Sequence, residues 1–140
     1  HPHLYFFKLT SIMSYFRLTF ILSIFIILSA CSGQEPASLT DRVQNLNMQD
    51  EYEEALDILH ERDQDENEVQ QLLIATHMNY ALYLTHESDA AMRERMPSAL
   101  RHFRRVLELD PTNSRARAEA DQIESVYRSL GRDIPEGVAS

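Results

Sequence analysis

Residues 95–113 read Arg-Met-Pro-Ser-Ala-Leu-Arg-His-Phe-Arg-Arg-Val-Leu-Glu-Leu-Asp-Pro-Thr-Asn. Ala99, Phe103 and Val106 are spaced four and three residues apart, which places them on one face of a helix. Pro111 stops that helix, because the residue before a proline is pushed out of the α region. The stretch therefore predicts a helix with one apolar face and a defined end.

The same spacing occurs upstream, where Ala55 and Leu59 lie four residues apart and Val43 precedes Ala55 by twelve. A small residue, a large apolar residue four later and a closing proline resemble the second helix of a tetratricopeptide repeat. The first copy departs from that pattern, since Val43 replaces a smaller residue and the closing proline is absent. The resemblance implies that close helix packing is made by Val43, Ala55, Leu59, Ala99, Phe103, Val106 and Pro111.

The segments around these helices complete the predicted fold. Leu39, Val43 and Leu46 form the apolar stripe of a helix capped by Ser38 or Thr40. Residues 68–86 are apolar nearly all round, which indicates a central helix. The next helix is expected to start near Ser88 or Asp89, with Pro97 in a first turn or at a kink. We therefore predict an all-α domain over residues 38–131, a short tetratricopeptide-like solenoid of helical hairpins with a C-terminal capping helix. Residues 132–140 are expected to be a frayed tail.

The resemblance also implies a binding surface. In that family the first helix of each repeat lines a concave groove, which implies a partner groove formed by Gln44, Asn47, Gln71, Ile74 and Met78. No lysine lies in this groove, so an apolar or basic segment is expected rather than an acidic peptide tail. The alternative is that the last helix covers Ile74 and Met78, which are then core residues.

The N-terminal residues indicate export. Residues 18–30 are almost wholly apolar and follow Arg17, and thirteen residues are fewer than the ~20 that span a bilayer, so residues 1–30 are predicted to be a signal peptide. Met13 is a conventional start, so residues 1–12 are interpreted as upstream sequence. The run Leu-Ser-Ala-Cys resembles the lipobox of bacterial lipoproteins, which implies cleavage between Ala30 and Cys31 and acylation of Cys31, with palmitate among the chains. Residues 31–37 are then a flexible tether.

The charge distribution limits the partners. The chain of 140 residues has a formal net charge of −9, which argues against binding nucleic acid. Residues 31–92 hold 14 acidic residues and two arginines, whereas residues 93–140 hold eight acidic residues and nine arginines. One end of the domain is therefore expected to be negative and the other roughly neutral. The charge alone does not distinguish a solvated surface from one that steers a basic partner.

No enzyme motif occurs in the sequence. There is no nucleophile–base set, phosphate loop or paired-cysteine metal site, so no catalytic residue, cofactor or metal is predicted. His77 is interpreted as a hydrogen-bonded core residue. The predicted function is a lipid-anchored scaffold on the bacterial cell membrane or outer membrane, facing the periplasm or exterior, that binds a protein or peptide segment. Oligomerisation is left open. The alternative is a small accessory enzyme or a glycan- or anion-binding lipoprotein that uses the basic patch of Arg93, Arg95, Arg101, Arg104 and Arg105.

Overall fold

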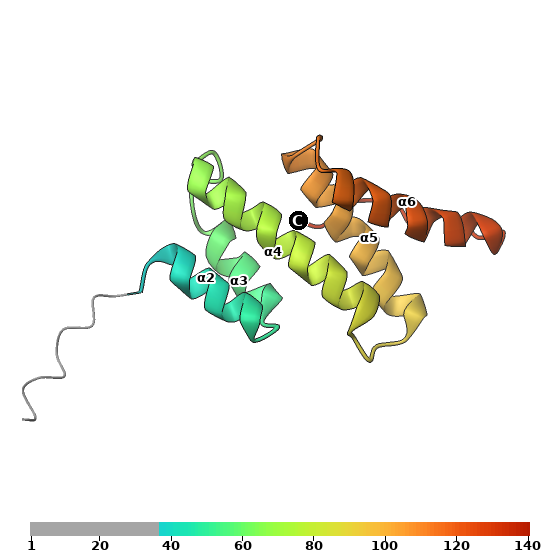
Figure 1. The fold of residues 1–140 in the computed structure, drawn as a ribbon, viewed down its shortest axis with the longest axis horizontal. Coiled ribbons are helices and arrows are strands. Elements are labelled where there is room, and N and C mark those ends of the chain that lie inside the picture. Colours follow the sequence, from blue (N-terminus) through green and yellow to red (C-terminus); the bar gives the residue numbers. More distant parts are fainter. Residues whose placement is uncertain (1–36) are drawn as a thin grey trace, which may run out of the picture. The chain divides into compact units, whose positions relative to one another are not determined.

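The structure is a computed structural model that describes residues 37–140. Within them the chain forms five α-helices and no strand (Figure 1). The helices are α2 (Leu39–Met48), α3 (Tyr52–His60), α4 (Asn67–His86), α5 (Met92–Leu109) and α6 (Ser114–Ser129). Consecutive helices pack on one another as hairpins, and residues 38–140 form one compact unit. The predicted all-α, solenoid-like fold is confirmed for this part of the chain.

Two helices begin at polar residues whose side chains cap them. The Ser38 hydroxyl accepts a hydrogen bond from the Asp41 N–H at 3.1 Å, and the Asp41 carboxylate accepts one from the Ser38 N–H at 3.3 Å. This capping box satisfies two groups that the first turn of α2 would leave unpaired. At α6 the Asn113 side-chain oxygen accepts a hydrogen bond from the Ala116 N–H at 3.0 Å. Both helix starts are therefore specified locally.

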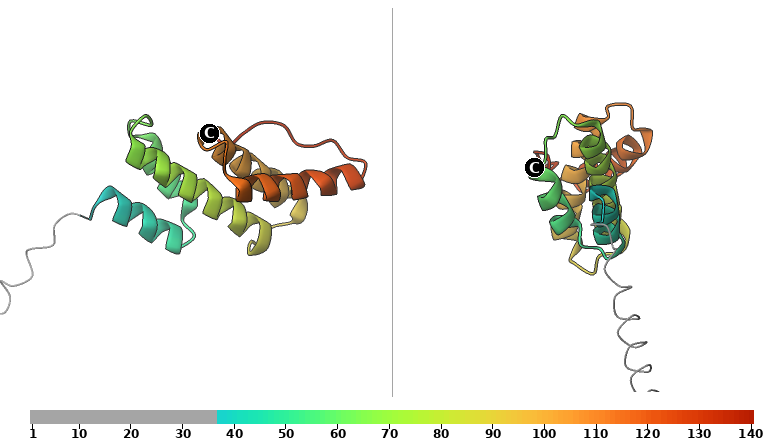
Figure 2. Two further views of the ribbon diagram at one scale, coloured as in Figure 1. Left: turned by 45° about the horizontal axis from the view of Figure 1, so that its top comes forward. Right: turned by 90° about the vertical axis from the view of Figure 1, so that its left-hand side faces the viewer.

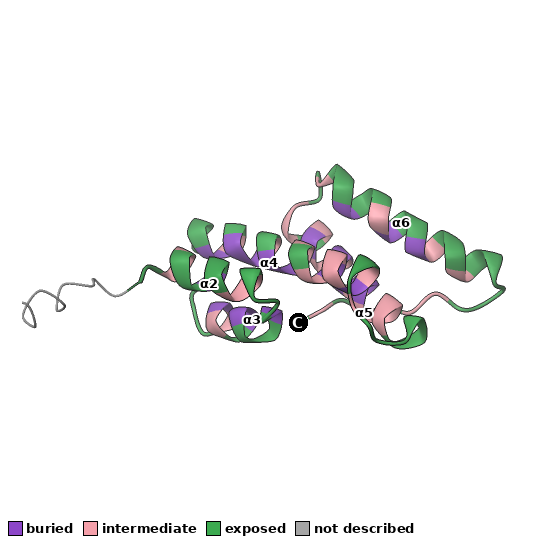
Figure 3. Ribbon diagram, turned by 60° about the horizontal axis from the view of Figure 1, so that its bottom comes forward, coloured by how far each residue is buried: buried purple, intermediate pink, exposed green. Residues whose placement is uncertain are grey.

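α4 is the central helix of this unit. It packs on α2, α3 and α5, and buried residues lie along its length (Figure 3). These buried residues contribute to two separate core clusters. Val69 and Leu73 join the N-terminal cluster with α2 and α3, whereas Ala81 and Leu84 join the C-terminal cluster with α5 and α6. An apolar surface on several sides of α4 is thus explained by its several neighbours, as the sequence indicates.

The predicted packing positions lie in this core. Six of them have no exposed surface: Val43, Ala55, Leu59, Ala99, Phe103 and Val106. Pro111 is exposed and follows the end of α5 at Leu109. Pro111 therefore acts on the backbone, by ending a helix, and not through buried contacts.

α5 begins at Met92, so Pro97 lies inside the helix, in its second turn. The expectation of a first-turn position for Pro97 is wrong. A proline at this position cannot donate to the carbonyl of Arg93, four residues earlier. The helix starts later than the expected Ser88 or Asp89 because the Ser88 hydroxyl accepts a hydrogen bond from the Ala90 N–H at 3.2 Å and stabilises a bend there.

The last residues, 132–140, are not frayed as expected. The chain turns at Gly131, whose φ of 64° suits glycine, and runs back past α5 toward α3 (Figure 2). Ile134 packs against the C-terminal core cluster, and the Ala139 N–H donates to the carbonyl of Arg101 at 3.3 Å. We call residues 132–140 the tail segment.

The predicted signal peptide, the cleavage site at Ala30 and the acylated Cys31 lie outside the described residues. Within residues 37–140, no helix is both long enough and apolar enough to cross a bilayer.

Candidate functional site

The residues of the predicted partner groove lie in three different environments. Gln44 and Gln71 are exposed, on α2 and α4. The Asn47 side-chain amide donates to the Thr76 hydroxyl at 3.0 Å, so Asn47 joins α2 to α4. Ile74 and Met78 are half-buried and pack against the C-terminal core cluster. The predicted groove thus offers two free polar side chains, and its apolar members already have protein contacts.

The C-terminal half of the unit carries a different apolar surface. Two adjoining hollows, about 310 Å³ and 140 Å³ in volume, share Met92 and Met96 of α5 and Val126 and Tyr127 of α6. We call the surface formed by these four residues the α5–α6 groove. Leu130, Arg93 and Arg132 line one end of it, and Glu119 lines the other.

The α5–α6 groove exposes apolar side chains to solvent. Met92 and Leu130 are each 61% exposed and Val126 is 46% exposed, and together they are three of the five large hydrophobic residues that are exposed within residues 37–140. Single exposed hydrophobic residues are common, but a contiguous apolar surface with charged residues at its edge is typical of an interaction site. Methionine side chains at such a surface are flexible and fit partners of different shape.

The sequence places these residues on apolar stripes but does not show that they are exposed. Met92 and Met96 lie four residues apart on α5, and Val126 and Leu130 lie four apart on α6. The buried residues of α6 end at Ile123, so its apolar surface extends beyond the part that is covered. An apolar stripe on α6 that continues beyond the buried residues of the helix is the sequence signal that could have identified the groove.

Most of the basic patch is bound to other parts of the protein. Arg95 donates to the carbonyls of Leu84 and Thr85 at the end of α4, and Arg104 pairs with Glu124 at 3.1 Å. Arg105 pairs with Glu108 at 2.9 Å, and Arg93 pairs with Glu94 at 3.5 Å. Arg101 lines a polar hollow between α3, α4 and α5 and makes no side-chain hydrogen bond within the described residues. The five arginines therefore do not converge on a shared anion site.

Two histidines meet between α4 and α5. The Nδ1 atoms of His77 and His102 lie 2.9 Å apart, and His77 is fully buried. Burial lowers the pKa of His77 to about 3, with a smaller contribution from the nearby His102, and burial lowers the pKa of His102 to about 4. Both imidazoles are therefore neutral at pH 7.

The hydrogen bond between neutral imidazoles needs one N–H donor and one bare nitrogen. The Nε2 atom of His77 is buried without a partner, whereas His102 lines the polar hollow. A buried N–H without a partner is costly, so the geometry favours His77 as the donor through Nδ1. His102 then carries its hydrogen on Nε2. The interpretation of His77 as a hydrogen-bonded core residue fits this contact.

His60 lies near the pair, with its ring centre 6.5 Å from that of His77. Even so, within residues 37–140 no group of three or more His, Cys, Asp or Glu side chains is arranged to hold a metal ion. The histidines thus form a packing contact that the sequence spacing did not predict.

Acidic side chains gather around α3. Glu53, Glu54 and Asp57 line a hollow beside Tyr52 and Tyr80, whose rings stack with centres 5.0 Å apart. The Tyr80 hydroxyl donates to Glu53 at 2.9 Å, and burial together with this bond raises the pKa of Tyr80 to about 12. Several acidic residues of the N-terminal half thus line one hollow together with two stacked tyrosines.

Comparison with known proteins gives no relative. No protein-family model matches the chain, and no curated protein and no solved structure matches it significantly.

Proposed function

We propose that this protein is a scaffold that binds a helical segment of another protein in the α5–α6 groove. The observation that carries the proposal is the exposure of Met92, Val126 and Leu130 in one contiguous apolar surface. Covering such a surface is favourable by about 25 cal/mol for each Å² of apolar area removed from water. The groove lies between two helices, and a third helix can pack its apolar side chains into such a space.

The charges at the groove define its partner. Arg93 and Arg132 line the end that contains Leu130. The pair between Arg93 and Glu94 is highly exposed, and exposed pairs are weak, so Arg93 is available to another carboxylate. The partner is therefore an amphipathic helix whose apolar face covers the groove and whose acidic residues meet the two arginines.

The proposal includes an anchor outside the cytoplasm. It rests on the apolar run of residues 18–30 and on Cys31 at its end, which resemble the signal peptide and lipobox of bacterial lipoproteins. The resemblance to tetratricopeptide repeats supports the same function, because proteins of that family are scaffolds for other proteins. No observation favours the alternative of an enzyme or an anion-binding lipoprotein, since four of the five arginines on which it depends pair with protein atoms and the five do not converge on one site.

A binding experiment with two designed peptides tests the groove. One peptide forms an amphipathic helix with leucines at i, i+3, i+4 and i+7 and flanking glutamates, and the other has lysines in place of the glutamates. We expect the acidic peptide to bind at least about tenfold more tightly than the basic one, a difference of about 1.4 kcal/mol. Fluorescence anisotropy measures both affinities.

The matched variants are Val126→Glu in the groove and Met48→Glu on α2, since both residues are exposed. Neither change should alter the unfolding midpoint appreciably, because exposed substitutions usually shift stability by less than about 0.5 kcal/mol. Val126→Glu should weaken binding of the acidic peptide at least about tenfold, and Met48→Glu should leave it unchanged. Equal affinity of Val126→Glu and Met48→Glu for the acidic peptide would show that the peptide does not bind in the α5–α6 groove.

A further inference from the structure

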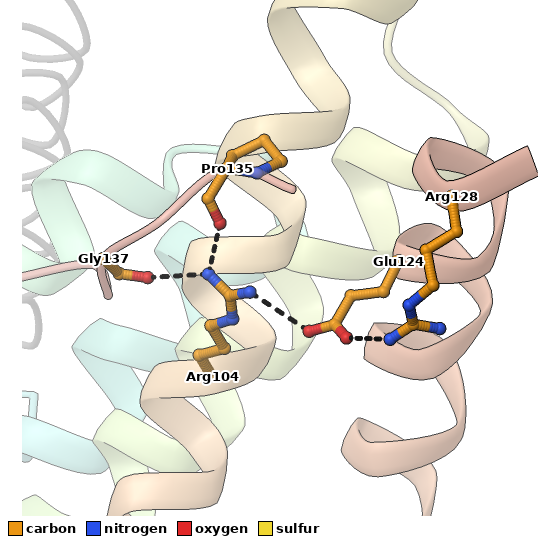
Figure 4. A network of polar contacts seen from close by, with 5 residues as sticks. All are labelled: Arg104, Glu124, Arg128, Pro135 and Gly137. Atoms are coloured by element: carbon orange, nitrogen blue, oxygen red, sulfur yellow. Dashed lines mark hydrogen bonds and ion pairs between the residues drawn. The ribbon is translucent and has the colours of Figure 1, made fainter. Parts of the chain in front are cut away.

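The tail segment is held through its main chain. Arg104 Nη1 donates to the carbonyls of Pro135 and Gly137, the second at 3.3 Å (Figure 4). The Ala139 N–H donates to the carbonyl of Arg101 at 3.3 Å. Two of these bonds use carbonyls, which every residue has, and the third uses an N–H, which every residue except proline has. They therefore select a backbone path rather than side chains, and the φ of 93° at Gly137 requires a glycine at that point of the path.

The Arg104 side chain is held by α6 as well as by the tail segment. Its Nη2 donates to Glu124 of α6 at 3.1 Å, and the other carboxylate oxygen of Glu124 accepts from Arg128 at 2.8 Å (Figure 4). The side chains of Arg104 and Glu124 are only 24% and 21% exposed. A planar guanidinium fixed on one edge presents its other N–H groups in a defined direction. The ion pair therefore points Arg104 at the two carbonyls.

One side chain of the tail segment contributes apolar contact. Ile134 is half-buried against the C-terminal core cluster, whereas Glu136 and Gly137 are exposed and Val138 is 42% exposed. The contacts that hold the tail segment thus follow a pattern. An aliphatic side chain is followed by bonded carbonyls one and three positions later and by a bonded N–H five positions later.

The tail segment lies over a polar hollow. Val138, Ala139 and Ser140 line this hollow together with Glu53 and His60 of α3, Tyr80 of α4, and Arg101 and His102 of α5. His102 is only 7% exposed, and its Nε2 makes no protein hydrogen bond within the described residues. The side chains of Arg101 and His102 thus line the hollow beside the last three residues of the tail segment.

We propose that Arg104, the Arg101 carbonyl and this hollow form a binding site for a peptide segment that bends at a glycine, with the tail segment as its occupant within the chain. A partner segment with the same pattern, an aliphatic residue followed three positions later by a glycine, displaces the tail segment and takes over its hydrogen bonds. Main-chain pairing supplies the affinity, as it does when a peptide adds to an exposed backbone edge. This site lies on α3, α4 and α5, whereas the α5–α6 groove is lined by α5, α6 and Arg132, the first residue of the tail segment.

The test uses the full chain and a synthetic peptide with the sequence of residues 132–140, blocked at both ends. In the wild type the tail segment competes at an effective concentration in the millimolar range, so the added peptide should bind weakly. Ile134→Ser removes the aliphatic contact of the tail segment and should release it. We expect this variant to bind the peptide at least about tenfold more tightly than the wild type.

Arg104→Lys, combined with Ile134→Ser, tests whether peptide binding depends on the hydrogen bonds that the Arg104 guanidinium donates to the two carbonyls. Lysine keeps the positive charge beside Glu124 but cannot donate to Glu124 and both carbonyls in the same fixed geometry. The double variant should lose the gain in affinity while its unfolding midpoint stays near that of Ile134→Ser. Hydrogen exchange gives a second readout, since the Ala139 amide should be protected in the wild type and exchange freely in Ile134→Ser.

Two results would overturn the proposal. One is a peptide affinity of Ile134→Ser no greater than that of the wild type. The other is full peptide binding by the double variant with Arg104→Lys. Adding Val126→Glu to Ile134→Ser distinguishes this site from the α5–α6 groove. The double variant should bind the peptide as tightly as Ile134→Ser alone.

Discussion

The Nδ1 atoms of His77 and His102 lie 2.9 Å apart in the interface between α4 and α5. The two residues are 25 positions apart in the sequence, and they meet because a short connection folds the two helices into a hairpin. Their environment disfavours a positive charge on either ring, since both are buried and Arg105 and Arg101 are nearby. The contact thus links the stability of the helical hairpin to pH.

We predict that the protein loses stability as the pH falls below about 6.5. The folded-state pKa values of His77 and His102 are lowered to about 3 and about 4, so between these values and 6.5 the unfolded chain binds more protons. Acid therefore favours unfolding, and the free energy of unfolding should fall by about 2–4 kcal/mol from pH 7.5 to pH 5. Urea unfolding at the two pH values measures this loss.

His77→Gln should reduce that pH dependence substantially, because it removes one of the two titrating groups and keeps a hydrogen-bonding side chain. His86→Gln is the matched control, since the His86 side chain is 57% exposed, and it should retain the wild-type dependence. An unchanged loss of stability in His77→Gln would contradict the role given to this pair.

Phe103 is the largest fully buried side chain of the C-terminal cluster. Phe103→Ala should lower the free energy of unfolding by about 3–5 kcal/mol, because it removes buried surface and leaves a cavity. Ala118→Gly on the exposed face of α6 is a mild control, expected to cost about 1 kcal/mol from helix propensity alone. Comparable unfolding midpoints for the two variants would show that Phe103 is not a core residue.

These examples show how far the sequence determines the fold. Local signals were sufficient for the cap at Ser38 and for the burial of Ala99 and Phe103, because capping and helical periodicity act over a few residues. The sequence could not place the tail segment, since Arg104 and Pro135 are 31 positions apart and their contact depends on how α5 and α6 pack. The meeting of His77 with His102 depends on tertiary structure in the same way.

Met78 separates the two interpretations of the predicted partner groove. Met78 is half-buried against the C-terminal cluster, so Met78→Glu should destabilise the protein by about 1–3 kcal/mol, because it places a carboxylate beside apolar side chains. Gln71→Glu on the same helix is the control, since Gln71 is exposed and should tolerate the change. A Met78→Glu variant that melts with the wild type and loses its partner would instead support the predicted groove.

Cys31→Ser tests the proposed anchor. The variant should lose the attached fatty acids and leave the signal peptide uncut at this position. Each buried methylene contributes about 0.8 kcal/mol to membrane binding, so two or three chains hold a protein firmly on a bilayer. Metabolic labelling with a radioactive fatty acid measures the attachment. Equal incorporation by the wild type and Cys31→Ser would exclude acylation at this cysteine.

Photo-cross-linking in the cells that make the protein shows whether the α5–α6 groove binds a helix of another protein. A photoreactive amino acid is placed at Val126 in the groove or, as the control, at Met48 on α2, because both positions are exposed. Mass spectrometry then identifies the cross-linked peptide. We predict that Val126, and not Met48, cross-links to one protein through an amphipathic helix with acidic residues beside its apolar face. Equal cross-linking from both positions, or products at Val126 with no amphipathic helix in common, would contradict the binding of a helix in the α5–α6 groove.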